Sequence, residues 1–459
     1  MPNTPKAASD NITKKATLKN EEPAAPIATS AATSTAARID EGYPSSRKVD
    51  TLFSAFTLPS GLTLKNRIVK AAMEENLATI EQVPSQTLLT MYRKWAEGGA
   101  GLILTGNVMV DHLAMTGPGG LALEQNTDIA AFAQLARVSK HNDCKVVMQI
   151  NHPGRQVFSK MGGKVLSASN VPLDMGKHSH LFGQPKAMDV AEIEDVINRF
   201  VHSAQQAQKA GFDGVQIHAA HGYLLAQFLS PLTNKRNDHW GGSIENRARL
   251  LLTITREIKQ VCGSLFSISV KLNSADFQRG GFEPADAQMV VDMLSELNID
   301  FVELSGGSYE APAMQGNTAD ARSLAREAYF LEFAQGISAH SSVPIMTTGG
   351  ITRLPVAQQV INSGVALVGM ATALAFTPDL PNMWQQKQED VHVMPKLKWK
   401  DKTLSGLATM AMVKRQIRRV GEGKSPQGKL SPIISLILDQ VRTAKLTKRY
   451  RKRFNDELS

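Results

Sequence analysis

The sequence predicts an α/β protein whose main body is a (β/α)8 barrel, with a disordered N-terminal arm and a basic, mainly helical C-terminal extension. From Thr51 onward, eight short apolar segments alternate with helical patterns. Alternation of this kind builds right-handed βαβ units on a parallel sheet, and eight units close into a barrel. An open doubly wound sheet is the structural alternative. It usually carries a G-x-G-x-x-G turn after its first strand, which this sequence lacks.

The expected strands are short and apolar, as strands buried on both faces are. They are 64–73, 101–106, 145–150, 214–217, 267–272, 300–304, 344–347 and 366–369. The expected helices are 86–97, 128–141, 191–211, one that runs through Ile258, 284–297, 327–338 and 353–363. Gly98 and Gly99 end the first helix, and Pro284 lies in the first turn of its helix, where it replaces no hydrogen bond.

Both ends of the chain differ in composition from the barrel, which we expect to span residues 49–384. Residues 1–48 are rich in Ala, Ser, Thr, Pro and Lys without a hydrophobic period, which predicts disorder. Residues 385–459 form the mainly helical C-terminal extension, with a helix expected at 403–420 and a segment at 432–454 that carries apolar residues and then KRYRKRF.

The positive charge of the chain lies in this extension. Residues 391–459 hold 17 Lys and Arg against 5 Asp and Glu, a net +12 that leaves −3 for the remainder of the +9 chain. The barrel therefore shows no charge signature of nucleic-acid binding. We expect the extension to fold on the barrel with a solvated basic end. Contact with a partner subunit, an acidic protein or an anionic membrane surface is the alternative.

Cysteine content and hydropathy limit the class of protein further. Cys144 and Cys262 are the two cysteines, too few for a disulfide framework or an iron–sulfur cluster held by four thiolates. Two thiols predict reducing, cytoplasmic surroundings. The sequence has no apolar run of about 18 residues, so a transmembrane segment is not expected. The oligomeric state stays open, with a homo-oligomer among the alternatives.

Three reactive side chains follow the fourth expected strand, 214–217. They are His218, His221 and Tyr223. The C-terminal ends of barrel strands are where such enzymes hold their catalytic groups. A third metal ligand is not evident beside the two histidines, so a metal site is not expected here.

Glycines end the last two strands. Gly349 and Gly350 follow strand seven, and Gly369 ends strand eight beside Met370. Barrels frequently bind phosphate with these two loops, because glycine lets backbone N–H groups approach the oxygens. Each loop alone would indicate only a tight turn, but glycines at the ends of both final strands predict a phosphorylated ligand.

With these motifs placed, the chain resembles the Old Yellow Enzyme family of FMN-dependent ene-reductases, the NADH:flavin oxidoreductases, over about residues 50–383. The motifs that carry the resemblance are LKNRIVKAAM (64–73), QINHPGRQ (149–156), HAAHGYLLAQFLSPLTNKRND (218–238), GGSIENR (241–247), SGG (305–307) and TTGGI (347–351), with the ending at Gly369. The resemblance implies FMN at the C-terminal mouth of the barrel, reduced by NADH or NADPH. It also implies hydride transfer to an activated alkene such as an enone, an enoate or a nitroalkene.

The resemblance also implies residue roles. His218 and His221 match the pair that holds the electron-withdrawing oxygen of the substrate, where negative charge develops during hydride transfer. Tyr223 matches the proton donor to Cα. Gln149 matches the residue on the pyrimidine edge of the flavin, and Lys271 the cation near its N1 and O2. The remaining residues expected around the flavin are Ala71, Ala72, Met73, Glu74, Gly106, Gly349, Gly350, Gly369 and Met370.

Two positions depart from the family pattern. Glu74 stands where relatives carry Thr or Cys near the O4 and N5 edge of the flavin, although Glu75 could face inward instead. Met370 stands where many relatives carry a phosphate-binding Arg. These departures keep a second function open, an FMN- or phosphate-ligand-binding barrel that acts through its basic tail. A flavin-independent lyase is a weaker alternative, since Lys271 is the one lysine at a strand end available for a Schiff base.

Overall fold

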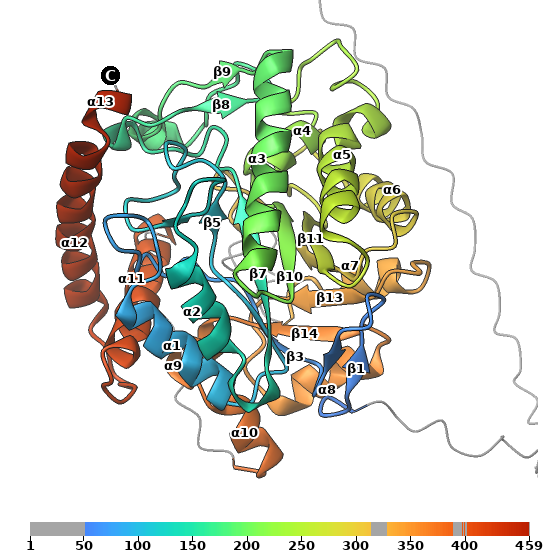
Figure 1. Ribbon diagram of the computed structural model, residues 1–459, viewed down its shortest axis with the longest axis vertical. Helices are drawn as coiled ribbons and strands as arrows, with labels where there is room; N and C mark the ends of the chain where they lie inside the picture. Colours follow the sequence, from blue (N-terminus) through green and yellow to red (C-terminus); the bar gives the residue numbers. More distant parts are fainter. Residues whose placement is uncertain (1–50, 314–327, 389–396, 398, 400–401, 459) are drawn as a thin grey trace, which may run out of the picture. The chain divides into compact units, whose positions relative to one another are not determined.

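The structure, a computed structural model, describes residues 51–313, 328–388, 397, 399 and 402–458. Its centre is a closed barrel of eight parallel strands surrounded by helices (Figure 1). This confirms the predicted fold class. The arm expected at 1–48 lies outside the described residues, and the proposed division of the chain at residues 48 and 384 stays a prediction.

All eight barrel strands follow one another around the barrel in chain order. They are β3 (Ile68–Lys70), β4 (Leu102–Leu104), β7 (Lys145–Asn151), β10 (Gly214–Ala219), β11 (Ser267–Asn273), β12 (Phe301–Ser305), β13 (Ile345–Thr348) and β14 (Leu367–Met370). The pairing of β14 with β3 closes the ring. The first predicted strand is shorter than expected because Asn66 interrupts it. The Asn66 Oδ1 accepts the Ile68 N–H at 3.0 Å, and the preceding segment forms a separate hairpin.

The shorter strands lie outside the barrel ring or at its rim. They are β1 (Phe56–Thr57), β2 (Thr63–Leu64), β5 (Val108–Met109), β6 (Leu121–Ala122), β8 (Leu166–Ser167) and β9 (Lys186–Ala187).

The helices that the sequence predicts around the barrel begin and end within a few residues of their expected bounds, whereas the short helices at 224–229, 372–376, 380–385 and 455–458 were not predicted. Those around the barrel are α1 (Gln86–Glu97), α2 (Ala130–Ser139), α3 (Val190–Lys209), α4 (Leu224–Leu229), α5 (Ile244–Cys262), α6 (Pro284–Ser295), α7 (Leu331–Ser338), α8 (Leu354–Asn362), α9 (Thr372–Phe376) and α10 (Leu380–Gln385). The C-terminal helices are α11 (Lys402–Gly421), α12 (Pro432–Arg453) and α13 (Asn455–Leu458). Among the described helices, none combines the length and the apolar character that a bilayer crossing requires.

The barrel interior changes from apolar at the bottom to polar at the mouth. Side chains alternate along each strand, so residues two apart share a face. Val147 and Phe301 belong to the apolar cluster at the bottom of the barrel. Two positions further along the same strands, Gln149 and Glu303 are buried polar residues. A closed floor of packed side chains thus supports a polar layer at the C-terminal ends of the strands.

Outside the ring, a buried ion pair ties β3 to α1. Lys70 Nζ lies 3.1 Å from Glu75 Oε1 and over the Trp95 ring, 4.3 Å from its centroid. Burial lowers the pKa of Lys70, and Glu75 opposes this shift. The Tyr92 hydroxyl donates to Glu75 at 2.9 Å and accepts the Gly106 N–H at 2.9 Å. The pair therefore links the ends of the first two barrel strands to the first helix.

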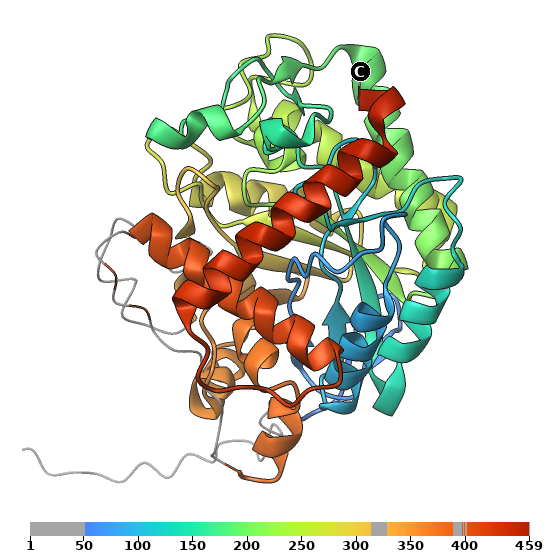
Figure 2. The same ribbon diagram turned by 90° about the vertical axis from the view of Figure 1, so that its left-hand side faces the viewer.

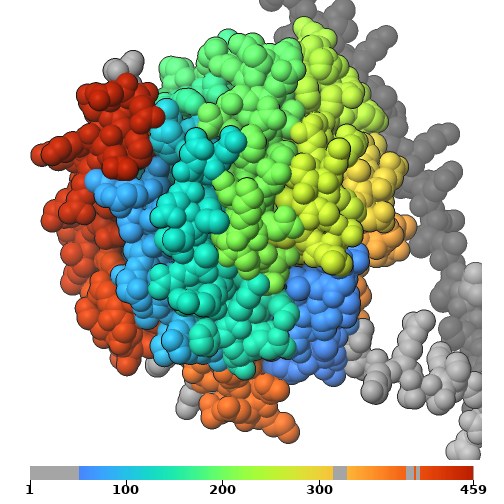
Figure 3. Space-filling view, in the orientation of Figure 1, coloured from blue at the N-terminus to red at the C-terminus, as the bar shows by residue number. Residues whose placement is uncertain are grey.

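The C-terminal hairpin of α11 and α12 lies across the mouth of the barrel. Figure 2 shows α12 running diagonally over this face, with α11 beside it. Arg442 donates to the carbonyl of Asn76 at 3.1 Å, and Tyr450 to that of His112 at 2.9 Å. In Figure 3 the red C-terminal helices lie directly against the blue segment that follows β3. The prediction that the extension folds on the barrel agrees with these contacts.

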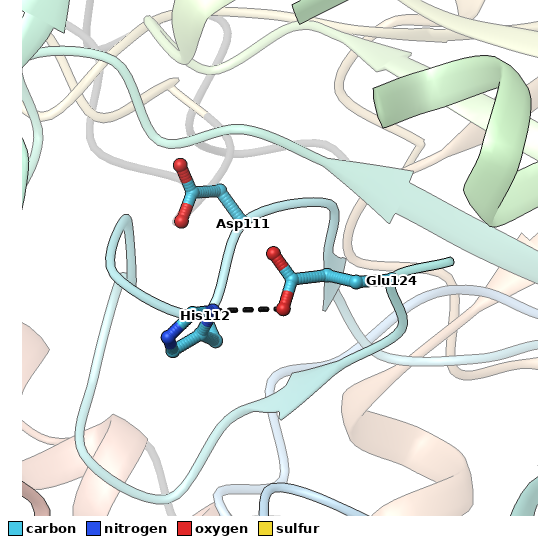
Figure 4. Close-up of side chains that lie close together, drawn as sticks. All are labelled: Asp111, His112 and Glu124. Atoms are coloured by element: carbon cyan, nitrogen blue, oxygen red, sulfur yellow. Dashed lines mark hydrogen bonds and ion pairs between the residues drawn. The ribbon is translucent and has the colours of Figure 1, made fainter. Parts of the chain in front are cut away.

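A cluster of charged residues around His112 binds the C-terminal end of this hairpin. Figure 4 shows three of them, Asp111, His112 and Glu124. His112 Nδ1 lies 2.7 Å from Glu124, and its Nε2 lies 2.9 Å from Glu457 near the C-terminus. Arg199 of α3 pairs with Glu124 at 2.8 Å and lies 3.8 Å from Asp111. His112, Asp111 and Glu124 lie close enough to hold a cation. Because Lys164 pairs with Asp111 at 2.7 Å, Arg199 pairs with Glu124 and both histidine nitrogens have partners, the cluster is an ion-pair network.

The buried Lys70–Glu75 pair predicts a large loss of stability when its charge balance is broken. We expect Glu75→Gln to lower the free energy of unfolding by about 3 kcal/mol, because it leaves the buried ammonium without a counter-charge. Glu97→Gln is the matched control, since Glu97 pairs with Arg93 on the exposed face of α1 at 2.8 Å. That change is expected to cost about 0.5 kcal/mol or less. Equilibrium urea unfolding measures both, and equal losses would contradict this account.

The His112 cluster predicts a pH-dependent attachment of α13. Hydrogen bonding to Glu124 raises the pKa of His112 despite the opposing effect of burial, and Glu457 and Asp111 raise it further. Since the folded pKa exceeds the unfolded value, this stabilisation is complete below about pH 6.5 and disappears as pH rises through the folded pKa. Amide exchange of residues 450–457, corrected for intrinsic rate, should be about fivefold faster above that pKa, corresponding to ~1 kcal/mol. A His112→Asn variant that keeps the same pH dependence would exclude His112 as the cause.

Candidate active site

His218 lies at the mouth end of β10 and faces the barrel interior. The strand continues to Ala219, so His218 belongs to it, whereas the sequence prediction placed the strand end before His218. Parallel register sets His218 beside Lys271 of β11. Its Nδ1 accepts the Ala220 N–H at 3.2 Å, which assigns the ring proton to Nε2. Burial, then the neighbouring His221 and Lys271, lower the pKa of His218 well below its usual value, so the ring is neutral.

His221 is held next to His218 by a strained turn. Its backbone has φ +61°, a left-handed conformation that non-glycine residues rarely adopt. Asn273 accepts the His221 N–H at 3.0 Å, and His221 Nε2 lies 2.7 Å from Ser305 Oγ. The two imidazole centroids are 5.0 Å apart. Burial lowers the pKa of His221 well below its usual value, with a smaller effect from Lys271, so the site presents two neutral imidazoles.

Tyr223 lies beside the histidines at the start of α4. Its ring stands edge-on to His218, with centroids 4.8 Å apart. Its hydroxyl lies 3.3 Å from that of Tyr309, which comes from the loop after β12. Burial raises the pKa of Tyr223 well above its usual value, and Tyr309 and Glu74 add to the shift. The phenol therefore keeps its proton at neutral pH.

A chain of buried hydrogen bonds crosses the barrel below the histidines. Gln149 Nε2 donates to Gln216 at 2.7 Å, and Gln216 Nε2 donates to Glu303 at 3.0 Å. The other Glu303 oxygen accepts from Lys271 Nζ at 2.8 Å. Lys271 and Glu303 are both buried, so the positive charge expected near the flavin is balanced by a carboxylate. Sequence reasoning missed Glu303, although a lone carboxylate in the apolar segment FVELS (301–305) is a usable signal.

The opposite side of the mouth is lined by small residues. Ala71 and Ala72 follow β3 in the apolar cluster of the barrel interior, and Gly369 is paired with Val69 in β14. A Cβ on Gly369 would lie 2.5 Å from Met346 and 3.0 Å from Thr348. Glycine at position 369 is therefore required by packing within the barrel, while polar side chains come from the facing strands.

The glycines after β13 form a turn that other residues would not tolerate. Gly349 has φ +113° and Gly350 φ +72°. A Cβ on Gly350 would lie 2.6 Å from the Tyr329 ring. Thr347, at the end of the same strand, has a buried Oγ1 with no hydrogen-bond partner among the described residues. These features suit a ligand held by backbone N–H groups. Met370 is buried on the helix-facing side, and its carbonyl accepts the Ala71 N–H, so its side chain supplies no contact to such a ligand.

The two adjacent glutamates take different directions. Glu75 is buried in the Lys70 pair, and a Cβ on Gly106 would lie 2.1 Å from both Glu75 Oε2 and the Met73 carbonyl. Glu74 accepts a hydrogen bond from Thr116 at 2.5 Å and lines the entrance to the mouth. Glu74 is therefore the carboxylate on the ligand side, next to Tyr223 and Tyr309, and Gly106 is fixed by packing.

The arginines of the sequence motifs brace the surrounding loops. Arg155 pairs with Glu310 at 2.6 Å, Arg236 with Asp238 at 2.6 Å, and Arg247 with Asp286 at 3.1 Å. The first of these pairs fixes the loop that carries Tyr309. Sequence reasoning missed Tyr309 itself, because a loop tyrosine has no periodic pattern that signals its direction.

The described residues fit FMN. Barrel ends of this kind hold a phosphate with the loops after strands seven and eight, and here both loops have the required glycines. Gln149 and Lys271 present amide and ammonium groups opposite the small residues Ala71 and Ala72. A flat heteroaromatic ring with one polar edge matches this division of the mouth.

A match to the NADH:flavin oxidoreductase / NADH oxidase family covers residues 51–390. The NADH-dependent flavin oxidoreductase iliE of Hypocrea jecorina is 35% identical over 71% of this chain and 86% of that protein. The iliE protein of Neonectria sp. is 35% identical over 77% of this chain, which spans half of that longer relative. The NADH-dependent flavin oxidoreductase nadA of Aspergillus parasiticus is 38% identical over 62% of this chain and 67% of its own length.

Solved structures agree with this assignment. The old yellow enzyme homologue from Zymomonas mobilis superimposes with a TM-score of 0.65 at 25% identity, covering 75% of this chain and 95% of that one. Morphinone reductase in complex with tetrahydroNAD, at 21% identity and a TM-score of 0.62 over 74% of this chain and 91% of that one, shares the fold. The chain thus belongs to the NADH:flavin oxidoreductase / NADH oxidase family, the Old Yellow Enzyme family, and is an oxidoreductase that uses FMN and a nicotinamide nucleotide.

Proposed function

We propose that this protein reduces activated alkenes, taking electrons from NADH or NADPH. The observation that carries the proposal is the group of two neutral imidazoles and a protonated phenol at one end of β10. When held at the mouth beside Gln149 and Lys271, FMN would supply the redox chemistry, the transfer of a hydride from the nucleotide to Cβ of the alkene.

His218 and His221 hold the electron-withdrawing oxygen of the alkene. The His218 Nε2–H is a donor because its Nδ1 already accepts from Ala220. The Ser305 hydroxyl can donate to His221 Nε2, which leaves the His221 proton on Nδ1 as the second donor. Donors fixed before the reaction stabilise the charge that develops on this oxygen.

Tyr223 provides the proton that Cα needs after hydride arrival at Cβ. Its raised pKa keeps it protonated, and the strongly basic enolate carbon can still remove that proton. Tyr309 lies within hydrogen-bond distance and is the route by which the phenol is reprotonated from the entrance. Glu74, on the entrance side, favours the neutral state of both phenols.

Replacing the proton donor should separate the two half-reactions. We expect Tyr223→Phe to leave flavin reduction by NADH unchanged and to slow re-oxidation by 2-cyclohexenone by about 10²-fold or more. Tyr309→Phe is the comparison variant. It keeps the donor and removes only the reprotonation route, so re-oxidation in a single turnover should stay unchanged. Anaerobic stopped-flow absorbance measures both steps. Equal slowing of both half-reactions in Tyr223→Phe would show that Tyr223 is not the donor.

The Lys271–Glu303 pair should set the redox potential of the flavin. Glu303→Gln leaves the Lys271 ammonium without its counter-charge, so we expect a potential at least about 30 mV more positive, equivalent to ~1.4 kcal/mol for a two-electron couple. Asp300→Asn is the control, because Asp300 precedes the same strand at its other end and accepts from Ser60. Spectroelectrochemical titration gives the midpoints. An unchanged or more negative midpoint in Glu303→Gln would contradict this role.

A further inference from the structure

A large cavity connects the site to the C-terminal hairpin. It has a volume of about 2060 Å³ and is lined by Glu74 and Tyr309 on the barrel side. Its other wall consists of residues from α11 and α12. Pockets of 300–1,000 Å³ bury a drug-sized ligand, so this space accommodates a dinucleotide. Any ligand that reaches the histidines from this side passes the hairpin.

The two walls of the cavity differ in charge. The barrel wall contributes Glu74 and Asp174 against Lys160 and His178, and its other two carboxylates, Glu75 and Glu310, are paired with Lys70 and Arg155. The hairpin wall contributes Lys414, Arg418, Arg442, Lys448, Arg451, Lys452 and Arg453, against Asp439 and Asp456. An anionic group in the cavity is therefore attracted to the hairpin wall.

Three half-buried cations on the hairpin form no ion pair with a carboxylate among the described residues. Lys414, Arg418 and Arg442 are half-buried. Within the described part of the chain, Lys414 and Arg418 pair with no carboxylate, and Arg442 donates to a backbone carbonyl. Burial lowers the pKa of Arg442, the positive Arg418 lowers it further, and Asp439 and Glu422 oppose the shift. Placing like charges together in a partly desolvated wall favours binding of an anion with several oxygens.

We propose that the α11–α12 hairpin is the diphosphate-binding wall of the active site, with Lys414 and Arg418 as specificity-determining residues. This rests on the proposed function, in which a nicotinamide nucleotide donates the hydride. The diphosphate of that nucleotide is the ligand with the required chemistry, and an acyl-coenzyme A substrate carries the same group. A membrane surface fits less well, because these side chains line the cavity.

A charge-removing pair of substitutions tests this with a matched control. Lys414→Gln with Arg418→Gln removes two charges from the cavity wall. Lys445→Gln with Arg449→Gln removes two exposed charges from α12 outside the cavity lining. Calorimetry of ADP binding to the FMN-loaded protein reports the diphosphate site without any turnover. We expect the first variant to weaken ADP binding about tenfold, the effect of 1.4 kcal/mol, and the control to leave it unchanged.

The half-reactions then identify the source of the diphosphate. The cavity variant should raise the apparent Kd for NADH about tenfold and leave reduction by 1-benzyl-1,4-dihydronicotinamide, which has no phosphate, unchanged. A loss confined to crotonoyl-CoA in the oxidative half-reaction would also support the site and assign it to an acyl substrate. Undetectable ADP binding to the unmodified protein, or equal weakening of the phosphate-free donor, would overturn the proposal. Failure of alkene reduction alone would reject the proposed function and leave the ADP result standing.

Discussion

The parallel register of β7, β10, β11 and β12 is the constraint on which the rest of the site depends. It sets Gln149 beside Gln216, His218 beside Lys271, and Lys271 beside Glu303. A slip of one residue in any strand would turn these side chains out of the barrel. The apolar floor beneath them makes such a slip costly, because the same shift would expose its packed side chains. Register thus fixes both the core and the chemistry.

The sequence was sufficient to predict the barrel, its strands and the group formed by His218, His221 and Tyr223. Local hydrophobic runs and adjacency in the chain carry that information. The partners of these residues come from distant segments, and no local pattern marks them. Glu303 balances Lys271 from the next strand, and the Tyr309 hydroxyl reaches Tyr223 from a loop. Both contacts depend on how the strands pair.

The sequence also did not predict which way the side chains point at the two positions that depart from the family pattern, Glu74 and Met370. Glu74 and Glu75 are adjacent, and the structure separates them by turning Glu75 into the Lys70 pair and leaving Glu74 at the entrance. Met370 packs on the helix-facing side, so it does not take the place of a phosphate-binding cation.

The position of the C-terminal extension in the structure changes the interpretation of its charge. Its charge was visible in the sequence, but the position of Lys414 and Arg418 was not. It depends on the packing of α11 against α1 and α9 and on the contacts of Tyr450 and Glu457 with His112. The anchor and the cavity wall belong to one structural unit. Basic side chains that the sequence predicted to be solvated therefore lie at the entrance to the site.

We propose that electrons pass from a nicotinamide nucleotide to an alkene at the C-terminal mouth of the barrel. The most direct measurement is an anaerobic titration of the purified, FMN-loaded protein, first with NADH or NADPH and then with 2-cyclohexenone or a nitroalkene. We predict that one equivalent of nucleotide bleaches the flavin absorbance and that alkene addition restores it with formation of the saturated product. A protein that fails to hold FMN, or a bleached flavin that no activated alkene re-oxidises, would contradict the account.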